Sequence, residues 1–344
     1  MPPTNLITGG AGFIGCNLAH RLLGRGERVL LFDSLIRPGS GRNLAWIEER
    51  HAGDRLEVIR GDVRDFAAVE RAAARSDHVF HLAGQVAVTS SVHDPRADFE
   101  ANALGTFNVL EAARASPRRP IVVYASTNKV YGGLEGLEIA EDETRYRLAA
   151  LPHGVAERQP LDFHSPYGCS KGCGDQYTRD YARIYGLRSV VLRQSCIYGP
   201  RQMGVEDQGW LAWFAIAALR GERITIYGDG KQVRDVLFID DLLDAYDAVI
   251  ERIDRVAGGV FNIGGGPASS LSVWREYGPL LEGELGHEIP VAHADWRPGD
   301  QRVYLSDIRE AKRALGWAPK VGVEEGIRRL VGWVRGNTDL SRTP

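Results

Sequence analysis

The chain has 344 residues, of which 44% are hydrophobic and 25% are charged, and its formal net charge is -3. This composition excludes an intrinsically disordered chain and provides enough apolar side chains for a core of ordinary size. The small negative charge gives no electrostatic reason to expect a nucleic-acid partner. No apolar run reaches the ~20 residues that a membrane-spanning helix needs, and no basic-then-apolar leader precedes the first strand. We therefore expect a soluble cytoplasmic protein of about two domains, with no membrane partner.

The first half of the chain alternates short apolar runs with helical patterns. Residues 4–8 form the first apolar run, three glycines follow, and residues 13–23 repeat apolar side chains at helical spacing. Further strands are predicted within residues 28–33, 55–65, 77–84, 119–127 and 188–193, and helices at 98–115 and 167–186. Strands that alternate with helices predict an α/β protein with a Rossmann-type, doubly wound parallel sheet.

The second half of the chain is less regular. Residues 133–164 are polar, which predicts a long surface excursion of the kind that often belongs to an enzyme site. Later elements are predicted as a helix at 208–221, short strands and a helix within 222–251, a strand within 258–266 that returns to the main sheet, and tail helices around 274–286 and 307–315. We predict a Rossmann domain and a smaller C-terminal lobe, made of residues 1–194 with 234–266 and of residues 195–233 with 267–340.

Gly9, Gly12 and Gly15 stand between the first strand and the first helix. Glycine permits a tight turn and lets the backbone approach a pyrophosphate, and the helix that follows offers N–H groups and a positive dipole end. Asp33 ends the second strand, where a carboxylate accepts hydrogen bonds from a ribose 2′-hydroxyl and repels a 2′-phosphate. This favours NAD over NADP, although Arg37 and Arg42 close by weaken the preference. A plain turn cap is the alternative for Asp33.

Tyr167 and Lys171 are spaced so that both side chains lie on one face of a predicted helix. A free phenol has a pKa of about 10 and is a poor base at neutral pH, whereas a neighbouring ammonium lowers that pKa. Such a pair can therefore serve as a general base. An exposed helix with ordinary salt bridges is the alternative, and the spacing alone leaves both interpretations open.

The chain resembles the extended short-chain dehydrogenase/reductase family, which includes NAD-dependent epimerases and dehydratases. The resemblance covers nearly the whole chain and rests on the glycine turn, Asp33 and the segments "GDVRD", "HLAGQ", "YGCSK" and "VRDVLFIDD". It implies that Tyr167 is the catalytic base, that Lys171 tunes it, and that Thr127 completes the catalytic set, with Ser126 as the alternative to Thr127. It also implies NAD-binding residues, which are Gly9, Gly12, Phe13, Ile14, Gly15, Asp33, Asp62, Val63, Leu82, Ala83, Gly84, Asn102, Ser126, Tyr167 and Lys171. A helix N-cap is a further interpretation of Asp62.

Asn128 and Lys129 follow Thr127. Family members that eliminate water or carbon dioxide carry acidic residues there, because removing a C5 proton needs a carboxylate base and expelling a hydroxyl needs an acid. Asn and Lys cannot supply that pair. The two residues therefore argue against a 4,6-dehydratase, argue more weakly against a decarboxylase, and leave oxidation followed by re-reduction. A solvated turn is the alternative interpretation.

The segments "STNKVYG", "LDFHSPYGCSKG" and "GDGKQVRDV" resemble the nucleotide-sugar epimerases of this family. The resemblance implies an isomerase that inverts C2 of a CDP-deoxyhexose through a transient 2-keto sugar. A sugar that turns over in its pocket must be held through its diphosphate, so the substrate end should carry arginines, which suit bidentate phosphate contacts. The predicted substrate-binding residues are Gln85, Ser90, Thr127, Asn128, Arg201, Gln208, Arg234 and Arg302.

Other functions stay open at this point. An epimerase acting at C4, or on a 6-deoxy sugar that keeps its 3-hydroxyl, would use the same catalytic residues. A dehydrogenase that releases NADH and a non-catalytic NAD or nucleotide-sugar sensor are further alternatives, because fold does not imply function. Family members commonly pair through helices near 100–115 and 167–185, which implies a homodimer or homotetramer. The four cysteines lack CxxC spacing, so we expect reduced thiols and no metal.

Overall fold

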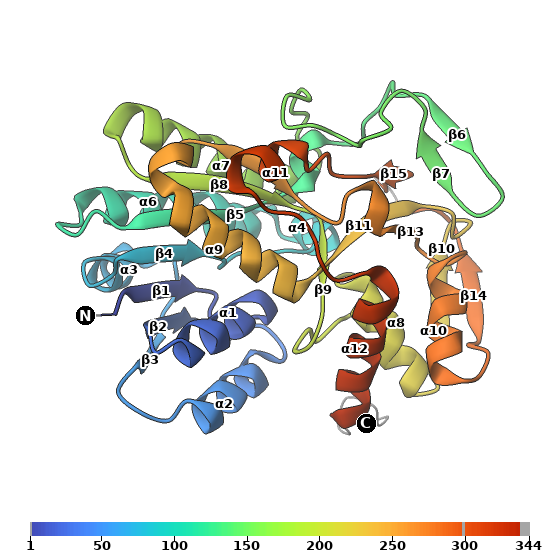
Figure 1. Ribbon diagram of the computed structural model, residues 1–344, viewed down its shortest axis with the longest axis horizontal. Coiled ribbons are helices and arrows are strands. Elements are labelled where there is room, and N and C mark those ends of the chain that lie inside the picture. The colour runs from blue at the N-terminus through green and yellow to red at the C-terminus, as the bar shows by residue number, and fades with distance from the viewer. Residues whose placement is uncertain (1, 298–299, 338–344) are drawn as a thin grey trace. The chain divides into compact units, whose positions relative to one another are not determined.

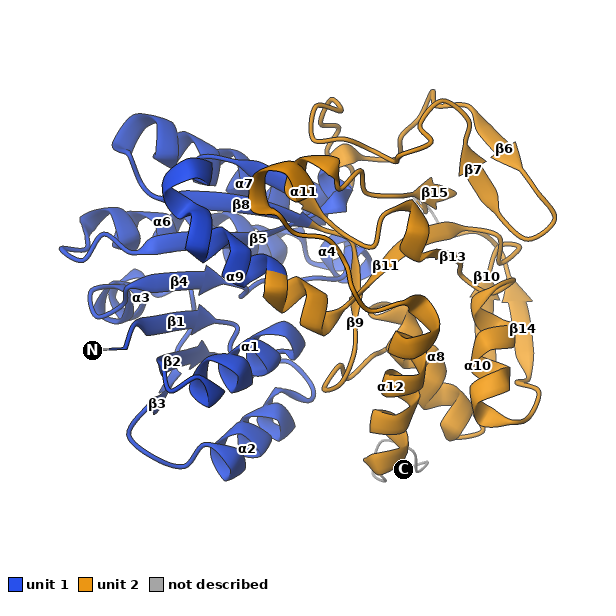
Figure 2. Cartoon of the chain, in the orientation of Figure 1, with its two compact units in different colours: residues 1–130, 165–193, 245–261 blue, residues 131–164, 194–244, 262–344 orange. Residues whose placement is uncertain are grey.

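Figure 1 shows the computed structural model, which describes residues 2–297 and 300–337. The chain divides into two compact units, coloured in Figure 2: unit 1 is residues 1–130, 165–193 and 245–261, and unit 2 is residues 131–164, 194–244 and 262–344. Residues 298–299 and 338–340 of the predicted C-terminal lobe lie outside the described residues. The assignment of NAD and nucleotide-sugar binding to separate domains stays a prediction.

Unit 1 is built on a seven-stranded parallel sheet with the strand order β12-β8-β5-β4-β1-β2-β3. These strands are β1 (Thr4–Thr8), β2 (Arg28–Asp33), β3 (Leu56–Arg60), β4 (His78–His81), β5 (Ile121–Thr127), β8 (Ser189–Gln194) and β12 (Val260–Ile263). The strand order reverses between β1 and β4, and open sheets of this kind bind ligands beyond the carboxyl ends of the strands at such a point. The predicted Rossmann-type parallel sheet, with residues 258–266 returning to it, is confirmed.

Helices cover both faces of this sheet, as Figure 1 shows. One face carries α3 (Phe66–Ala73), α6 (Gly105–Ala115) and α7 (Ser165–Tyr185), and the other carries α1 (Phe13–Gly24), α2 (Ser40–Arg50) and α9 (Ile239–Val256). Leu6, Phe32 and Val122 from the strands pack with Val109 and Tyr181 from the helices in one buried cluster. Strands buried on both faces explain why their sequences are almost continuously apolar.

The predicted helix at residues 98–115 is not a single regular helix. It consists of the end of α5 (Pro95–Phe99), a π-helical turn at Glu100–Leu104, and α6, and it follows the short helix α4 (Val88–His93). Asn102 lies buried in the π-helical turn. Such turns insert an extra residue and occur frequently at functional sites. No periodicity of the sequence distinguishes this turn from a regular helix.

Unit 2 contains smaller sheets. Its strands are β6 (Ile139–Glu141), β7 (Tyr146–Leu148), β9 (Cys196–Tyr198), β10 (Ile224–Tyr227), β11 (Val233–Phe238), β13 (Ser270–Ser272), β14 (Val291–Ala294) and β15 (Val303–Tyr304). Its helices are α8 (Trp210–Leu219), α10 (Tyr277–Leu285), α11 (Arg309–Leu315) and α12 (Val323–Gly336). No helix in residues 2–297 and 300–337 is long and apolar enough to cross a membrane.

Two features of unit 2 differ from the prediction. The excursion at residues 133–164 contains the antiparallel hairpin β6–β7, whose strands have only three residues each and give no period-two signal. Helix α12 was not predicted, although it buries Ile327, Leu330 and Val334 at helical spacing. Its apolar face is therefore a signal that sequence analysis could have used.

Gly9 and Gly15 shape the turn between β1 and α1. Gly9 has φ +72°, in the left-handed region that glycine adopts without strain. A Cβ on Gly15 would lie 2.3 Å from the carbonyl oxygen of Gly9 and 2.7 Å from the Cα of Gly10. The turn therefore has no room for a side chain at residue 15.

We expect Gly15→Ala to lower the melting temperature, because the added methyl group forces the turn apart at a cost of roughly 1–3 kcal/mol. Gly24→Ala is the matched control in the same helix, since a Cβ there meets nothing within 4 Å. Differential scanning calorimetry compares the two variants. Equal melting temperatures for Gly15→Ala and Gly24→Ala would show that the turn relaxes freely.

His81 lies buried at the end of β4. Its Nδ1 is 2.7 Å from Oγ1 of Thr8, and its Nε2 is 3.0 Å from Oγ1 of Thr106. Burial, followed by the positive charge of Lys171, lowers the pKa of His81 from 6.5 to about 3. His81 is therefore neutral in the folded protein near pH 7.

This difference predicts acid destabilisation. The unfolded chain binds a proton at His81 below pH 6.5, whereas the folded chain does so only near pH 3, so stability is lost as the pH falls through that window. Each pKa unit corresponds to about 1.4 kcal/mol of unfolding free energy. Urea unfolding at pH 7, 5.5 and 4.5 should show a shallower acid slope for His81→Asn than for the exposed control His287→Asn. Parallel slopes for the two variants would refute the assignment.

Candidate active site

The first part of the site is the glycine turn and the start of α1. Gly12 is the N-cap of α1, no side chain caps the helix, and the first turn carries no acidic residue. A helix N-terminus of this kind offers N–H groups and a positive dipole end to an anion. The predicted cofactor residues Gly9, Gly12, Phe13, Ile14 and Gly15 all lie here.

Asp33 forms hydrogen bonds with the backbone of the same turn. Its carboxylate accepts hydrogen bonds from the backbone N–H of Ala11 at 3.0 Å and of Leu35 at 2.8 Å. The turn-capping role is therefore present, and the ribose contact stays a prediction that the remaining lone pairs permit. Burial lowers the pKa of Arg37, while the charges of Asp33 and Tyr167 act in the opposite direction, so this guanidinium lies within electrostatic reach of both groups.

Asp62 follows β3 and pairs with Arg64. It accepts hydrogen bonds from the Arg64 backbone N–H at 2.9 Å and from Nη2 at 2.7 Å, and these contacts lower the pKa of its carboxyl. Asp65, not Asp62, is the N-cap of α3, because its side chain accepts from the backbone N–H of Ala68. The helix-cap interpretation of Asp62 is therefore wrong. Its predicted neighbour Val63 is buried, and residues 82–84 follow β4 directly.

Asn102 carries a buried acceptor that a bound ligand could satisfy. Its side-chain N–H groups donate to Asp98 at 3.0 Å and to the Ser170 hydroxyl at 3.1 Å. Its Oδ1 is buried and has no hydrogen-bond partner among the described residues. A buried acceptor of this kind is normally satisfied by water or a ligand. Together with the uncapped start of α1, it fits a bound dinucleotide.

The predicted catalytic residues come together in unit 1. Thr127 is the last residue of β5, where a 3-10 turn (Asn128–Tyr131) begins, and Tyr167 and Lys171 lie on one face of α7. All three side chains are buried, and Thr127 lies close enough to Tyr167 to influence the pKa of its phenol. Burial raises the pKa of Tyr167, whereas the contact with Thr127 lowers it.

Lys171 supplies the positive charge of this group. Its Nζ donates to the carbonyl oxygen of Ala125 at 2.6 Å and lies 4.4 Å from the centre of the Tyr124 ring. Burial lowers the pKa of Lys171 to about 7, and the carboxylates of Asp175 and Asp98 oppose that effect. Burial and the two carboxylates thus act in opposite directions on the Lys171 ammonium.

The residues on either side of Thr127 have different partners. The Ser126 hydroxyl donates to Asp175 at 2.8 Å, whereas the Thr127 hydroxyl donates to Oδ1 of Asn128 at 3.3 Å and accepts from the backbone N–H of Lys129. Ser126 is therefore engaged with the interior of the unit, which favours Thr127 as the catalytic hydroxyl. Asn128 is 7% exposed, so the solvated-turn interpretation is wrong for this residue.

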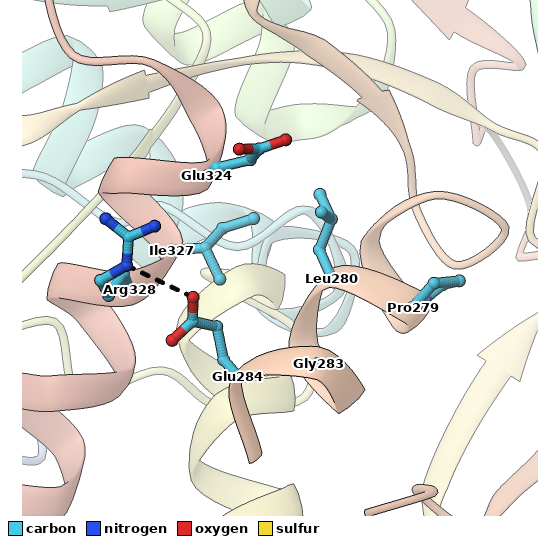
Figure 3. Close-up of a pocket in the computed structure, with 7 residues that line it drawn as sticks. All are labelled: Pro279, Leu280, Gly283, Glu284, Glu324, Ile327 and Arg328. Atoms are coloured by element: carbon cyan, nitrogen blue, oxygen red, sulfur yellow. Dashed lines mark ion pairs between the residues drawn. The ribbon is translucent and has the colours of Figure 1, made fainter. Parts of the chain in front are cut away.

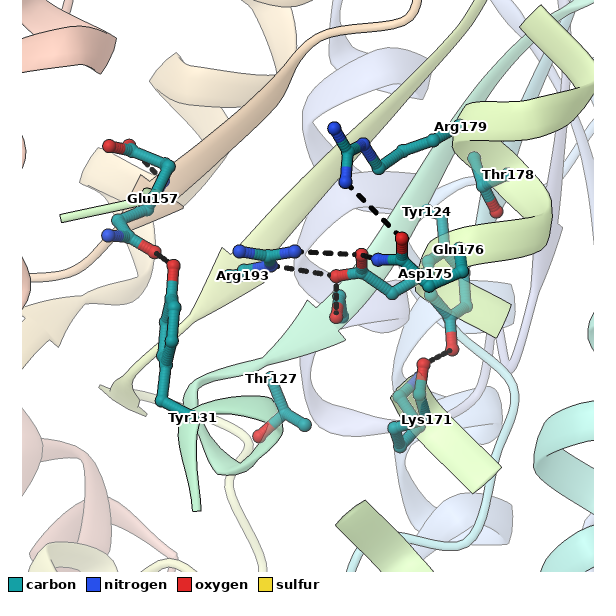
Figure 4. A network of polar contacts seen from close by, with 12 residues as sticks. Tyr124, Thr127, Tyr131, Glu157, Lys171, Asp175, Gln176, Thr178, Arg179 and Arg193 are labelled. Carbon is teal, nitrogen blue, oxygen red and sulfur yellow. Dashed lines mark hydrogen bonds and ion pairs between the residues drawn. The ribbon is translucent and has the colours of Figure 1, made fainter. Parts of the chain in front are cut away.

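Sequence analysis missed the buried polar groups behind Lys171. Figure 4 shows Asp175 between Arg193 of β8 and the end of β5, one helical turn beyond Lys171. Asp98 accepts a hydrogen bond of 2.5 Å from the Ser170 hydroxyl, and burial raises the pKa of its carboxyl. The spacing of Tyr167, Lys171 and Asp175 at intervals of four was an available signal, because it puts the three on one helix face.

The predicted substrate residues fall into two groups. In unit 1, the Gln85 amide donates to the carbonyl oxygen of Ala87 at 2.7 Å, and its Oε1 is a buried acceptor with no hydrogen-bond partner among the described residues. Ser90 is exposed on α4. Gln85 therefore retains an acceptor for a ligand hydroxyl, whereas Ser90 is open to solvent.

The other substrate residues belong to unit 2. The carbonyl oxygen of Arg302 accepts from the backbone N–H of Val233 at 2.8 Å, whereas the register of β11 and β15 pairs Arg234 with Tyr304. Arg234 is buried and pairs with Asp300 at 2.7 Å, and the Arg302 guanidinium lies 5.2 Å from the ring centre of Tyr146. Arg201 and Gln208 lie on the connection between β9 and α8.

Two cavities of about 220 Å³ occur within single units. Figure 3 shows the one between α10 and α12, which holds none of the predicted site residues and is lined by Pro279, Leu280, Gly283, Glu284, Glu324, Ile327 and Arg328. The other lies between α5 and α7, where Asp98 and Ser170 form part of its wall. This cavity is therefore in contact with Asp98 and Ser170, two of the polar groups near Lys171.

Comparison with known proteins identifies the family that this chain is similar to. Residues 5–264 match the family model of the NAD dependent epimerase/dehydratase family. The chain is 43% identical to the CDP-paratose 2-epimerase of Salmonella typhi, over 95% of this chain and 98% of that protein. It is 34% identical to the UDP-glucose 4-epimerase of Mycolicibacterium smegmatis, over 96% of this chain and 98% of that protein.

Solved structures agree with this result. A UDP-glucose 4-epimerase from Thermus thermophilus in complex with NAD has a TM-score of 0.79 and 34% identity, covering 97% of this chain and 99% of that one. A dTDP-glucose 4,6-dehydratase from Streptomyces venezuelae with NAD bound has a TM-score of 0.84 and 30% identity, covering 98% of each chain. The predicted resemblance and the NAD cofactor are confirmed: the chain belongs to the NAD dependent epimerase/dehydratase family.

Proposed function

We propose that this protein is an NAD-dependent epimerase that inverts C2 of CDP-paratose. The observation that carries the proposal is the buried set of Thr127, Tyr167 and Lys171, with Tyr167 and Lys171 on one face of α7. The amide of Asn128 stands where an eliminating enzyme needs a carboxylate. The extent of the similarity to a CDP-paratose 2-epimerase supports the choice of substrate.

In the proposed reaction Tyr167 takes the proton of the C2 hydroxyl, and the Thr127 hydroxyl turns from Asn128 Oδ1 to donate a hydrogen bond to the same oxygen. Bound NAD supplies the chemistry of accepting a hydride from C2 and returning it. The Lys171 ammonium favours the phenolate form of Tyr167. After the planar 2-keto sugar has turned over, Tyr167 returns the proton, so the net reaction inverts C2 and consumes nothing.

The remaining predicted site residues would bind NAD and the sugar nucleotide. We assign the turn at residues 9–15 and Asp33 to the pyrophosphate and ribose of NAD, since both present the required backbone N–H groups and carboxylate. Arg234 on β11 and Arg302, which directly precedes β15, would bind the diphosphate of the sugar nucleotide, with Arg234 exchanging its contact to Asp300. Gln85 would receive a sugar hydroxyl through its buried Oε1. Both ligands are metabolites of the cytoplasm, where we place the reaction.

Incubating the purified protein with CDP-paratose, without added cofactor, tests the reaction. We expect proton NMR to show conversion to the manno-configured sugar, because NAD that is regenerated in every cycle need not be supplied. In D2O the hydrogen at C2 should remain protium, since a returned hydride does not exchange with solvent. Uptake of deuterium at C2 would exclude the redox cycle, and no conversion by NAD-loaded protein would exclude this substrate. UDP-glucose in the same assay tests the alternative of a C4 epimerase.

Tyr167→Phe should lower kcat at least 10²-fold, because it removes the proton acceptor while leaving the ring that fills the site. Tyr185→Phe is the matched control, since this exposed tyrosine lies at the end of the same helix. NAD content and circular dichroism verify that both variants fold. Normal turnover by Tyr167→Phe would remove Tyr167 from the mechanism.

We also propose that the protein forms a homodimer through α6 and α7. Phe107, Tyr177 and Ile184 are apolar or aromatic side chains exposed on these two helices. A cluster of this kind is typical of an interface. Phe107 and Tyr177 pack edge to face at 5.8 Å and would form part of this surface.

Sedimentation velocity should give about twice the 37.9 kDa mass of one chain. Ile184→Glu should yield the monomer, because it buries a carboxylate in the proposed interface. Ile36→Glu is the control, since Ile36 is exposed but lies outside the two helices. A monomeric wild-type protein would exclude the dimer.

A further inference from the structure

We propose that Asp175 is a positioning residue, whose carboxylate ties β5 and β8 to the catalytic helix and holds the Lys171 ammonium in place. The proposal rests on the proposed roles of Tyr167 and Lys171. Neither the similarity to epimerases nor the spacing of the predicted catalytic residues assigns a role to Asp175.

The contacts of Asp175 are visible in Figure 4. Arg193 donates from Nε to Oδ2 at 2.9 Å and from Nη2 to Oδ1 at 3.0 Å, which is a bidentate pair. The Ser126 hydroxyl donates to Oδ2 at 2.8 Å, and the Gln176 amide donates to Oδ1 at 2.7 Å. Asp175 is 0% and Arg193 1% exposed. A buried pair of this kind seldom stabilises a fold more than apolar side chains would, so its value lies in fixing geometry.

The carboxylate acts on the site through β5. Ser126 stands between Ala125, whose carbonyl oxygen receives the Lys171 Nζ at 2.6 Å, and Thr127, which influences the pKa of the Tyr167 phenol. Holding the Ser126 side chain therefore fixes the backbone on both sides of it. Because Asp175 and Lys171 are one turn apart on α7, the same carboxylate sets the position of the helix against the strand.

The second effect of Asp175 is electrostatic. The charged and titratable groups around Lys171 are Asp175 on α7, Asp98 on α5, Tyr167 on α7, His81 on β4 and the Tyr124 ring on β5. Burial lowers the pKa of Lys171 to about 7, and Asp175 is the larger of the two opposing influences. His81 stays neutral near pH 7, so it does not compete for the carboxylates. Without Asp175 the ammonium would be lost at a lower pH.

Asp175→Asn tests both effects with nearly unchanged shape. In protein labelled with ¹³C at lysine Cε, we expect the Lys171 resonance to titrate about one pH unit lower than in the wild type. Lys171→Met identifies the resonance by its loss. Asp180→Asn is the matched control, because Asp180 is exposed on the same helix and should leave the titration unchanged. This measurement needs no substrate, so it stands or falls independently of the proposed reaction.

Arg193→Gln is a second variant in case Asp175→Asn does not fold. It leaves the Asp175 charge less neutralised, so the Lys171 pKa should move upward, opposite to the effect of Asp175→Asn. A Lys171 titration that is identical in wild type and in whichever variant folds would overturn the proposal.

Turnover gives a third measurement. The alkaline limb of the kcat profile should move to lower pH in Asp175→Asn, and Asp175→Glu should restore part of the shift. An equal loss of kcat at every pH, with an unmoved limb, would mean that Asp175 only stabilises the fold and would overturn the proposal. A shifted Lys171 titration in protein that does not convert CDP-paratose would support the positioning role while excluding the proposed substrate.

Discussion

The burial of one ammonium group, that of Lys171, is the constraint on which the rest of the candidate site depends. A buried cation needs hydrogen-bond acceptors and compensating charge, and the chain supplies them from three separate elements. The end of β5 offers the Ala125 carbonyl, α7 offers Asp175, and α5 offers Asp98. Burial, and then the positive charge of Lys171, lower the pKa of His81 and keep its imidazole neutral. The electrostatics thus select one arrangement of helix and strands.

The ionisation of the Tyr167 phenol depends on the groups around it. Burial and Asp98 raise its pKa, whereas Thr127 and Arg37 lower it, so the residues of unit 1 do not by themselves produce a strong base at neutral pH. The positive charge of an oxidised nicotinamide would favour the phenolate further. Proton abstraction would then follow only when oxidised NAD is bound, which suits a cycle that must not release its cofactor half-way.

The sequence was informative where function depends on local spacing. The glycine turn, the alternation of strands and helices, and the Tyr167–Lys171 pair all follow from neighbours within a few residues, so they could be predicted. Asp175 and Arg193 could not be paired in this way, because 18 residues and a change from helix to strand separate them. The π-helical turn around Asn102 is likewise set by tertiary contacts to Ser170, which no periodicity reveals.

The side chain at residue 128 affects both the ionisation of Tyr167 and the type of reaction that the site can support. It is buried and accepts a hydrogen bond from the Thr127 hydroxyl, and Thr127 influences the pKa of the Tyr167 phenol. A carboxylate at residue 128 would place a second negative charge beside that phenol and raise its pKa, because like charges disfavour ionisation. An eliminating enzyme must accept this cost to gain an acid or base for the sugar. A neutral amide avoids the cost and fixes the hydroxyl, which is sufficient for a reaction that only removes and returns one hydride and one proton.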